Sequence, residues 1–301
     1  MTRRAGLRTA LVALAAFLPV LAAPEGTPTS RYPPEQMEAA RAELRERLRG
    51  CHGADECAGL YARIVLVDRP GGALEALARE QWIANVGRTR ATLFALWPSV
   101  DVRSKVEILD AFRAHWSLLV QGVYPDLTSM VSEALESGDP ALREAGARLA
   151  AMRPIPRIAW PMIDAASEHP ELTQTAILAV GRERARYAAR WVVRTALATD
   201  DPAIAGAARW TIFNLGRAAA DMLKEALDGP DPQRAARAAD LLLVIAIPED
   251  EAVLTRWLAS RGEARPDLAG RVRRRLAELD TGLLPRTAPP IPELRLAPPA
   301  P

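Results

Sequence analysis

The sequence has few of the residue types that build most reactive sites. Its 301 residues include two cysteines and three histidines, Lys105 and Lys224 are its only lysines, and aromatic residues make up 5% of the chain. It contains no Gly-x-Ser-x-Gly segment, which marks many serine hydrolases, and no phosphate-binding glycine loop. The sequence therefore predicts no catalytic residue, no cofactor and no bound metal.

The two cysteines, Cys51 and Cys57, lie close together with His52 between them. In an oxidising compartment, an even number of cysteines at close spacing indicates a disulfide. Closing a loop of about seven residues would contribute about 2.4 kcal/mol, less any strain. Zinc is one alternative, although no second cysteine pair or paired histidine completes a tetrahedral site. Free redox-active thiols are the other alternative, and the spacing does not fit the Cys-x-x-Cys-His of covalent haem attachment.

Charge is arranged unevenly at the start of the chain. Arg3, Arg4 and Arg8 precede an uncharged apolar run over 10–23, which is too short to span a bilayer. This pattern predicts a signal peptide cleaved after Ala22, with Ala23 as the alternative site; a buried apolar helix is the alternative to export. We therefore expect an exported protein, periplasmic or extracellular, with no transmembrane segment in its mature form.

Removal of the signal peptide would also change the electrostatics. The formal charge of +2 includes Arg3, Arg4 and Arg8, so the mature chain would carry about −1. A chain near neutrality has no general attraction for nucleic acid, and we expect no nucleic-acid partner. Residues 2–8 also resemble a twin-arginine export signal, but Gly6 stands where that signal has a bulky apolar residue, so the route of export stays open.

Strand alternation is absent, and apolar residues recur at helical spacing instead, which predicts an all-α protein. Five prolines each open a helical stretch, at intervals of 30, 32, 30 and 34 residues: Pro140, Pro170, Pro202, Pro232 and Pro266. Proline is tolerated in the first helical turn because the N–H it lacks has no partner there, and a preceding Asp can cap the free amides. Three of the prolines follow Asp139, Asp201 and Asp231, and His169 is expected to serve the same helix start before Pro170.

Positions two, six and ten after each proline drift by only about 40° per step and form one stripe along a helix. The middle position is small in four of five copies, which lets neighbouring helices approach closely. Each interval leaves room for a first helix and a turn before the second helix. The expected pairs are 88–97 with 100–115, 124–136 with 140–152, 157–167 with 170–181, 184–199 with 202–215, 217–228 with 232–246, and 249–261 with 266–279.

A single helical hairpin cannot bury its apolar face and must stack on its neighbours. The sequence therefore predicts an all-α, right-handed α-solenoid of about six hairpins of about 30 residues each, with an N-terminal helical cap. The expected organisation is a signal peptide over 1–22, a linker over 23–32, a helical cap or module over 33–86, a repeat domain over 87–280 and a proline-rich tail over 281–301.

Residues 139–149 resemble the second helix of a HEAT-like repeat, through their Asp-Pro, aliphatic-Arg and small-small elements. The resemblance extends over residues 88–279. Other copies depart from it, since Arg143 has no basic counterpart and Arg234 replaces the expected aliphatic residue. HEAT-like proteins include scaffolds, adaptors and a few enzymes, so the resemblance implies an architecture, and any function taken from it is an analogy.

Positions four, eight and eleven after each proline lie opposite the stripe and are expected to face outward. The resemblance implies that this side of the second helix lines a concave surface, where apolar residues commonly bind a partner. The candidate partner-binding residues are Arg148, Gln174, Leu178, Trp210, Phe213, Asp240 and Leu243. The alternative is self-burial, with the tail or unusually packed first helices covering the apolar positions.

These features together predict an exported scaffold or adaptor that binds a protein or peptide on its concave surface and catalyses no reaction. One alternative is a lyase or another enzyme on the same helical scaffold, for which the sequence shows no reactive constellation. The other alternative is a structural component of the cell envelope.

Overall fold

The computed structural model describes residues 42, 46, 93–95, 97–114, 116, 125–281 and 288–294. The chain divides into two compact units, Met1–Glu80 and Gln81–Pro301, and every element named below belongs to the second. The predicted signal peptide and linker, and the predicted disulfide between Cys51 and Cys57, lie outside the described residues. So does the predicted module over 33–86, apart from two helical positions, Ala42 and Glu46.

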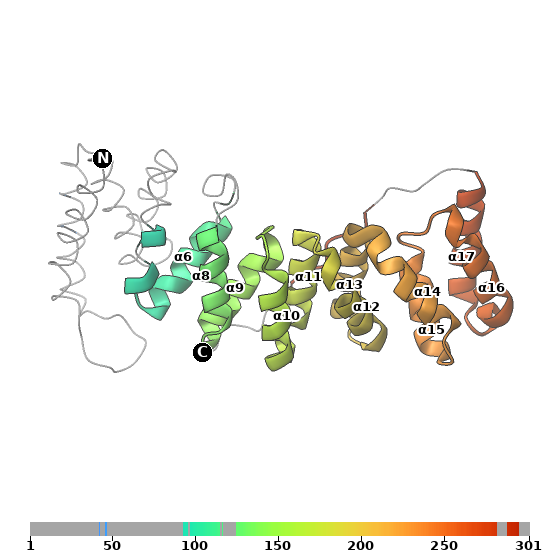
Figure 1. Ribbon diagram of the computed structural model, residues 1–301, viewed down its shortest axis with the longest axis horizontal. Helices are drawn as coiled ribbons and strands as arrows, with labels where there is room; N and C mark the ends of the chain where they lie inside the picture. The colour runs from blue at the N-terminus through green and yellow to red at the C-terminus, as the bar shows by residue number, and fades with distance from the viewer. Residues whose placement is uncertain are drawn as a thin grey trace. The chain divides into compact units, whose positions relative to one another are not determined.

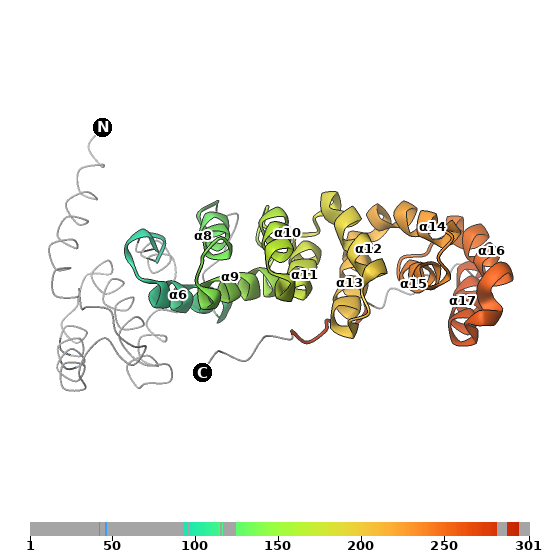
Figure 2. The ribbon, with the colours of Figure 1, turned by 90° about the horizontal axis from the view of Figure 1, so that it is seen from below.

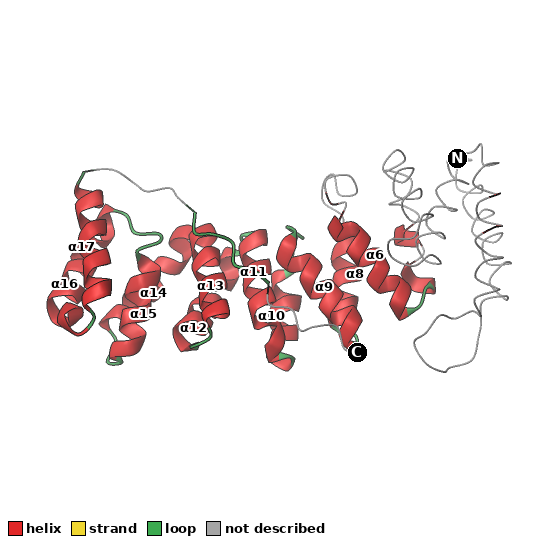
Figure 3. Cartoon of the chain, turned by 180° about the vertical axis from the view of Figure 1, so that it is seen from behind, coloured by secondary structure: helices red, strands yellow, loops and turns green. Residues whose placement is uncertain are grey.

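Within the described residues all regular structure is helical, which confirms the all-α prediction, and Figure 3 shows helices and loops alone. The α-helices are α6 (Val102–Ala114), α8 (Pro125–Leu135), α9 (Pro140–Met152), α10 (Ala159–Glu168), α11 (Thr173–Glu183), α12 (Ala189–Ala198), α13 (Pro202–Leu215), α14 (Ala220–Asp228), α15 (Pro232–Leu242), α16 (Glu251–Arg261) and α17 (Pro266–Asp280). Short 3-10 turns are η2 (Trp97–Ser99), η3 (Pro170–Leu172), η4 (Arg186–Ala188), η5 (Gly216–Ala219), η6 (Pro248–Asp250) and η7 (Gly262–Ala264).

The prolines of the repeat register stand where they were expected, at the first position of a helix or of the 3-10 turn that precedes it. Asp139 accepts hydrogen bonds from the amides of Ala141 and Leu142, at 2.9 and 3.0 Å. Asp201 caps α13 through one amide, and Asp231 caps α15 through two. These bonds satisfy amides that have no partner within the helix, which is why the helices begin at these positions.

His169 stands at the expected helix start, as the N-cap residue of η3, but its side chain does not act as the aspartates do. His169 makes no side-chain capping bond, and a 3-10 turn over Pro170–Leu172 precedes α11 instead. Its imidazole Nδ1 lies 3.7 Å from the Glu171 carboxylate rather than at the free amides. A short carboxylate reaches back over the first turn, whereas this ring is turned toward the neighbouring acid.

Replacement of the capping aspartate tests this difference. We expect Asp139→Ala to lower the free energy of unfolding by about 1 kcal/mol, because two helix amides lose their acceptor. His169→Ala is the matched control at the equivalent position of the next helix pair, and it should leave stability nearly unchanged. Chemical denaturation of both variants measures the difference. Equal losses at the two positions would contradict the assigned role of Asp139.

The helices of the second unit pair in sequence and form two layers. Each first helix contacts the second helix that follows it: α8 with α9, α10 with α11, α12 with α13, α14 with α15 and α16 with α17. The second helices α9, α11 and α13 contact one another in succession, α6 contacts α9, and α15 contacts α17. Figures 1 and 2 show the pairs following one another in chain order, with first helices in one layer and second helices in the other.

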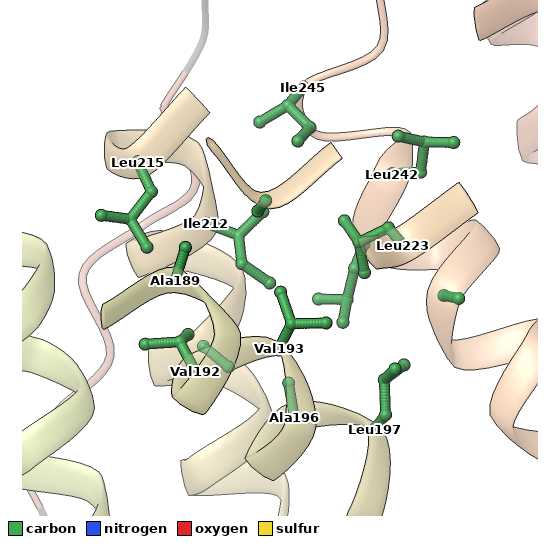
Figure 4. Packing of buried hydrophobic residues seen from close by; sticks show 14 of the residues in the cluster. Ala189, Val192, Val193, Ala196, Leu197, Ile212, Leu215, Leu223, Leu242 and Ile245 are labelled. Carbon is green, nitrogen blue, oxygen red and sulfur yellow. The ribbon is translucent and has the colours of Figure 1, made fainter. Parts of the chain in front are cut away.

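The predicted stripe lies in the core between successive pairs. Its middle residues Ala176, Ala208, Ala238 and Val272 are fully buried, whereas Arg234, which replaces an aliphatic residue, is exposed. Figure 4 shows side chains from α12, α13, α14 and α15 gathered in one cluster, including Val193, Ile212 and Leu223. Each helix pair therefore buries its apolar face against its neighbours as well as within itself, and this shared burial stabilises the stacking.

Candidate functional site

The candidate partner-binding residues differ in how far the structure exposes them. Leu178, Gln174 and Trp210 are buried, with exposed fractions of 1%, 5% and 6%. Their expected outward exposure is therefore wrong. Phe213 and Leu243 are half-buried, as are Arg148 and Asp240. The residues still available for contact on this side are thus fewer and more polar than the sequence pattern predicted.

Close packing between consecutive second helices accounts for the burial of Trp210. Its ring on α13 lies against the backbone of α11, where a Cβ on Gly181 would stand 2.6 Å from the ring carbon Cζ3. The Arg182 guanidinium covers the ring at 4.9 Å from its centroid. The second helices therefore contact each other along α9, α11 and α13, and position eight falls in these contacts instead of facing solvent.

Residues 292–294 of the C-terminal tail lie on the second helices. The Gln174 side-chain amide on α11 donates to the main-chain carbonyl of Glu293 at 2.9 Å. A Cβ on Gly206 of α13 would lie 3.6 Å from Cβ of Pro292, and Leu294 packs against the main hydrophobic cluster. Figure 2 shows this segment, coloured dark red, beside α13. The self-burial alternative therefore holds at α11 and α13, where the tail occupies part of the surface.

Gln174 and Gly206 occupy the same register position, four residues after Pro170 and Pro202. Position four was expected to face outward, and the tail reaches the second helices there. Along the tail, Pro292 and Leu294 are half-buried while Ile291 and Glu293 are exposed, an alternation typical of an extended segment with one face on a surface. The surface on α11 and α13 thus holds an extended polypeptide; below it is called the tail surface, defined by Gln174 and Gly206.

The remaining polar candidates are engaged within the chain. Asp240 on α15 accepts from Arg209 of α13 at 2.8 Å and also from Arg271 of α17, so one acid links three successive second helices. Arg148 pairs with Glu144 one turn earlier, at 2.6 Å. Because each charge already has a counter-ion, the partner-binding role proposed for Arg148 and Asp240 would require exchanging these pairs.

Arginine side chains also bridge helices by donating to main-chain carbonyls, which sequence reasoning missed. Arg153 donates to Arg113, Arg182 to Ala151, Arg237 to Leu197 and Arg261 to Gly229. The acceptors lie at helix C-termini, where carbonyls lack partners and the helix dipole is negative. Burial and the nearby Arg153 lower the pKa of Arg182. Much of the high arginine content of this region is therefore structural.

Asp250 at the end of η6 is a buried acid that the sequence did not single out. Its carboxylate accepts from Arg217 at 2.5 and 3.0 Å, pairs with Lys224 at 2.8 Å and accepts from the Ile247 amide at 3.1 Å. Burial alone would raise its pKa, but the hydrogen bonds from Arg217, Lys224 and Ile247 outweigh burial and hold the pKa below its ordinary value. This cluster ties η6 to η5 and α14.

On the first-helix layer two large aromatic side chains are exposed and stacked. Trp160 at the start of α10 is 51% exposed and Tyr187 in η4 is 52% exposed, with ring centroids 5.7 Å apart. The Tyr187 hydroxyl donates to Glu183, and burial together with this carboxylate raises its pKa to about 12. Trp160 and Tyr187 occupy different register positions of adjacent helix pairs. The sequence of either segment alone therefore could not predict that the two rings stack.

The described residues contain no group of three or more His, Cys, Asp or Glu side chains placed to hold a metal ion. Across the helices that the structure describes, none is long and apolar enough to cross a membrane. The geometry of the second helices instead provides a surface with a side-chain amide donor, a small residue and access to the apolar cluster. Such a surface suits binding of an extended chain.

Comparison with known proteins assigns this chain to no family. No protein-family model matches it, and no curated protein matches it. Among solved structures, an engineered protein of the Northeast Structural Genomics Consortium is 16% identical, and the match covers 80% of this chain and 96% of that one. The TM-score of 0.24 is too low for the likeness to bear on fold or function.

Proposed function

We propose that this chain is an exported scaffold, a right-handed α-solenoid of HEAT-like helical hairpins that binds a protein or peptide on its second-helix side without catalysis. Two features support the repeat architecture. Residues 151–160 and 181–190 have the same succession of buried and exposed positions although their sequences differ. Consecutive pairs also contact one another in order, as expected of units that stack.

The observation that carries the proposed binding function is the tail segment held on α11 and α13. An extended chain presents unpaired carbonyls on its edges and side chains alternating between two faces. The tail surface meets both requirements, with the Gln174 amide on the Glu293 carbonyl and apolar contacts at Pro292 and Leu294. A surface that holds one extended polypeptide has the chemistry to hold another.

Phe213 offers a test of partner binding on this side. It is half-buried on α13 and lies outside the main hydrophobic cluster, so its replacement should spare the fold. Trp210 is unsuitable because it is buried. We expect Phe213→Gln to reduce, by at least tenfold, the capture of a specific envelope protein or peptide by the immobilised chain, a loss of about 1.4 kcal/mol or more in binding.

Trp160→Gln, an exposed aromatic replaced on the first-helix layer, is the matched control and should leave capture unchanged. Bound material would be identified by mass spectrometry, and circular dichroism would check that both variants fold like the unaltered chain. Equal capture by the two variants would exclude α13 as the binding surface and defeat the proposal.

A further inference from the structure

We infer that the C-terminal tail is an intramolecular competitor for the tail surface, and that the external ligand is an extended peptide carrying proline followed two residues later by an aliphatic side chain. The inference rests on the proposed peptide-binding function and names its partner class and its regulation. It comes from the three contacts that Pro292, Glu293 and Leu294 make with second helices and the core cluster.

The first contact, between Gln174 and Glu293, is a hydrogen bond to the main chain of the tail. Gln174 is 5% exposed, and its amide nitrogen is 2.9 Å from the Glu293 carbonyl oxygen. The two residues are 119 positions apart in sequence, so the bond is a tertiary contact rather than a local turn. Because this amide donates to a main-chain carbonyl, the bond does not depend on the side chain at that position. A ligand can therefore carry a residue other than glutamate there.

The other two contacts involve side chains of the tail, Pro292 and Leu294. Gly206 leaves space beside Pro292, since even a Cβ on Gly206 would only reach ordinary contact at 3.6 Å from Cβ of Pro292. Leu294 packs against the apolar cluster, whereas Ile291 is 52% exposed. In an extended chain, residues two apart share a face. Proline and leucine therefore face the helices together, which defines the Pro-x-aliphatic pattern of the ligand.

Covalent attachment makes the tail a strong competitor even if each contact is weak. A covalently attached segment has an effective concentration on the order of millimolar at its own binding site. A separate peptide that makes the same contacts with a dissociation constant of about 0.1 mM would then bind on the order of tenfold more weakly while the tail is in place. A ligand with further contacts along the second helices would displace the tail and bind.

The test uses the full chain and a labelled synthetic peptide with the sequence of residues 286–297. Leu294→Asp in the protein should release the tail, because a carboxylate is unfavourable against the apolar cluster. Fluorescence anisotropy should then show the peptide binding at least tenfold more tightly to this variant than to the unaltered chain. Ile291→Asp is the matched control: it adds the same charge to an exposed tail position and should leave peptide binding as weak as in the unaltered chain.

Further variants make the outcomes distinct. Gln174→Ala added to Leu294→Asp should weaken peptide binding again, as should a labelled peptide in which the leucine corresponding to Leu294 is aspartate. The inference is overturned if Leu294→Asp, folded by circular dichroism, binds the peptide no better than the Ile291→Asp control. It is also overturned if the unaltered chain sediments as a dimer that Leu294→Asp dissociates, since the tail would then act between two copies. Neither result would change capture that depends on Phe213. The proposed function is therefore tested separately, by the Phe213→Gln variant.

Discussion

Gly181→Ala is expected to lower the free energy of unfolding by about 2 kcal/mol, although alanine normally favours a helix over glycine. The added Cβ would stand 2.6 Å from both Thr211 Oγ1 and Trp210 Cζ3, and 3.1 Å from Thr211 Cα. Thr211 is buried and donates to the Ile177 carbonyl at 2.8 Å, so its side chain cannot move away freely. The helices α11 and α13 must separate, which costs packing along their contact.

Gly270→Ala supplies the matched control, because Gly270 lies in α17 with nothing within 4 Å of the position of its Cβ. This variant should be neutral or stabilised by up to about 1 kcal/mol, through helix propensity alone. Thermal and urea unfolding should thus show a loss of stability for Gly181→Ala and no loss for Gly270→Ala. A neutral Gly181→Ala would mean that α11 and α13 do not approach as closely as described.

Asp250→Ala is expected to destabilise the protein by about 3 kcal/mol, the low end of the cost of removing one partner from a buried ion pair. The Asp250 carboxylate is fully buried, while Arg217 and Lys224 are partly exposed and regain some hydration when it is lost. The Ile247 amide would also lose its acceptor. Asp221→Ala is the control. Asp221 is an exposed residue whose carboxylate lies 3.8 Å from the ammonium of the same Lys224, so its loss should leave stability unchanged.

The same cluster predicts a pH dependence with a definite sign. The folded-state pKa of Asp250 lies below its ordinary value of 3.8, so protonation favours the unfolded chain. The stabilisation is fully present above pH 3.8 and is lost as the pH falls through the folded-state pKa. Acid unfolding of Asp250→Ala should therefore depend less steeply on pH below 3.8 than that of the unaltered chain. Parallel curves would show that Asp250 does not titrate with unfolding.

Local chemistry explains why the helix starts could be predicted so closely. Proline has no amide hydrogen to donate and its φ is fixed, so it suits only the first turn, and an adjacent aspartate satisfies the free amides. These effects act within a few residues, and α9, α13 and α15 accordingly begin at Pro140, Pro202 and Pro232. The burial of the small middle position of the stripe could also be predicted, because helical periodicity alone places it on one face.

The site was less predictable, because exposure at positions four and eight depends on neighbouring helix pairs. Leu178 and Trp210 were expected to face outward, and they are buried because α9, α11 and α13 pack directly on one another. Local structure explains only the bond that Asp250 accepts from the Ile247 amide, three residues earlier. Its ion pairs depend on Arg217, 33 residues earlier in the chain, and on Lys224 of α14, which only the tertiary structure brings to it.

The sequence by itself determined the helical character of the described region, the starts of its second helices and the spacing at which they recur. These depend on backbone constraints and on side-chain periodicity within single segments. Only the tertiary structure decided which positions of the second helices are buried. It alone also placed residues 292–294 on α11 and α13. A contact such as that between Gln174 and Glu293 joins positions 119 apart, where no local preference acts and only the packing of the intervening helices brings them together.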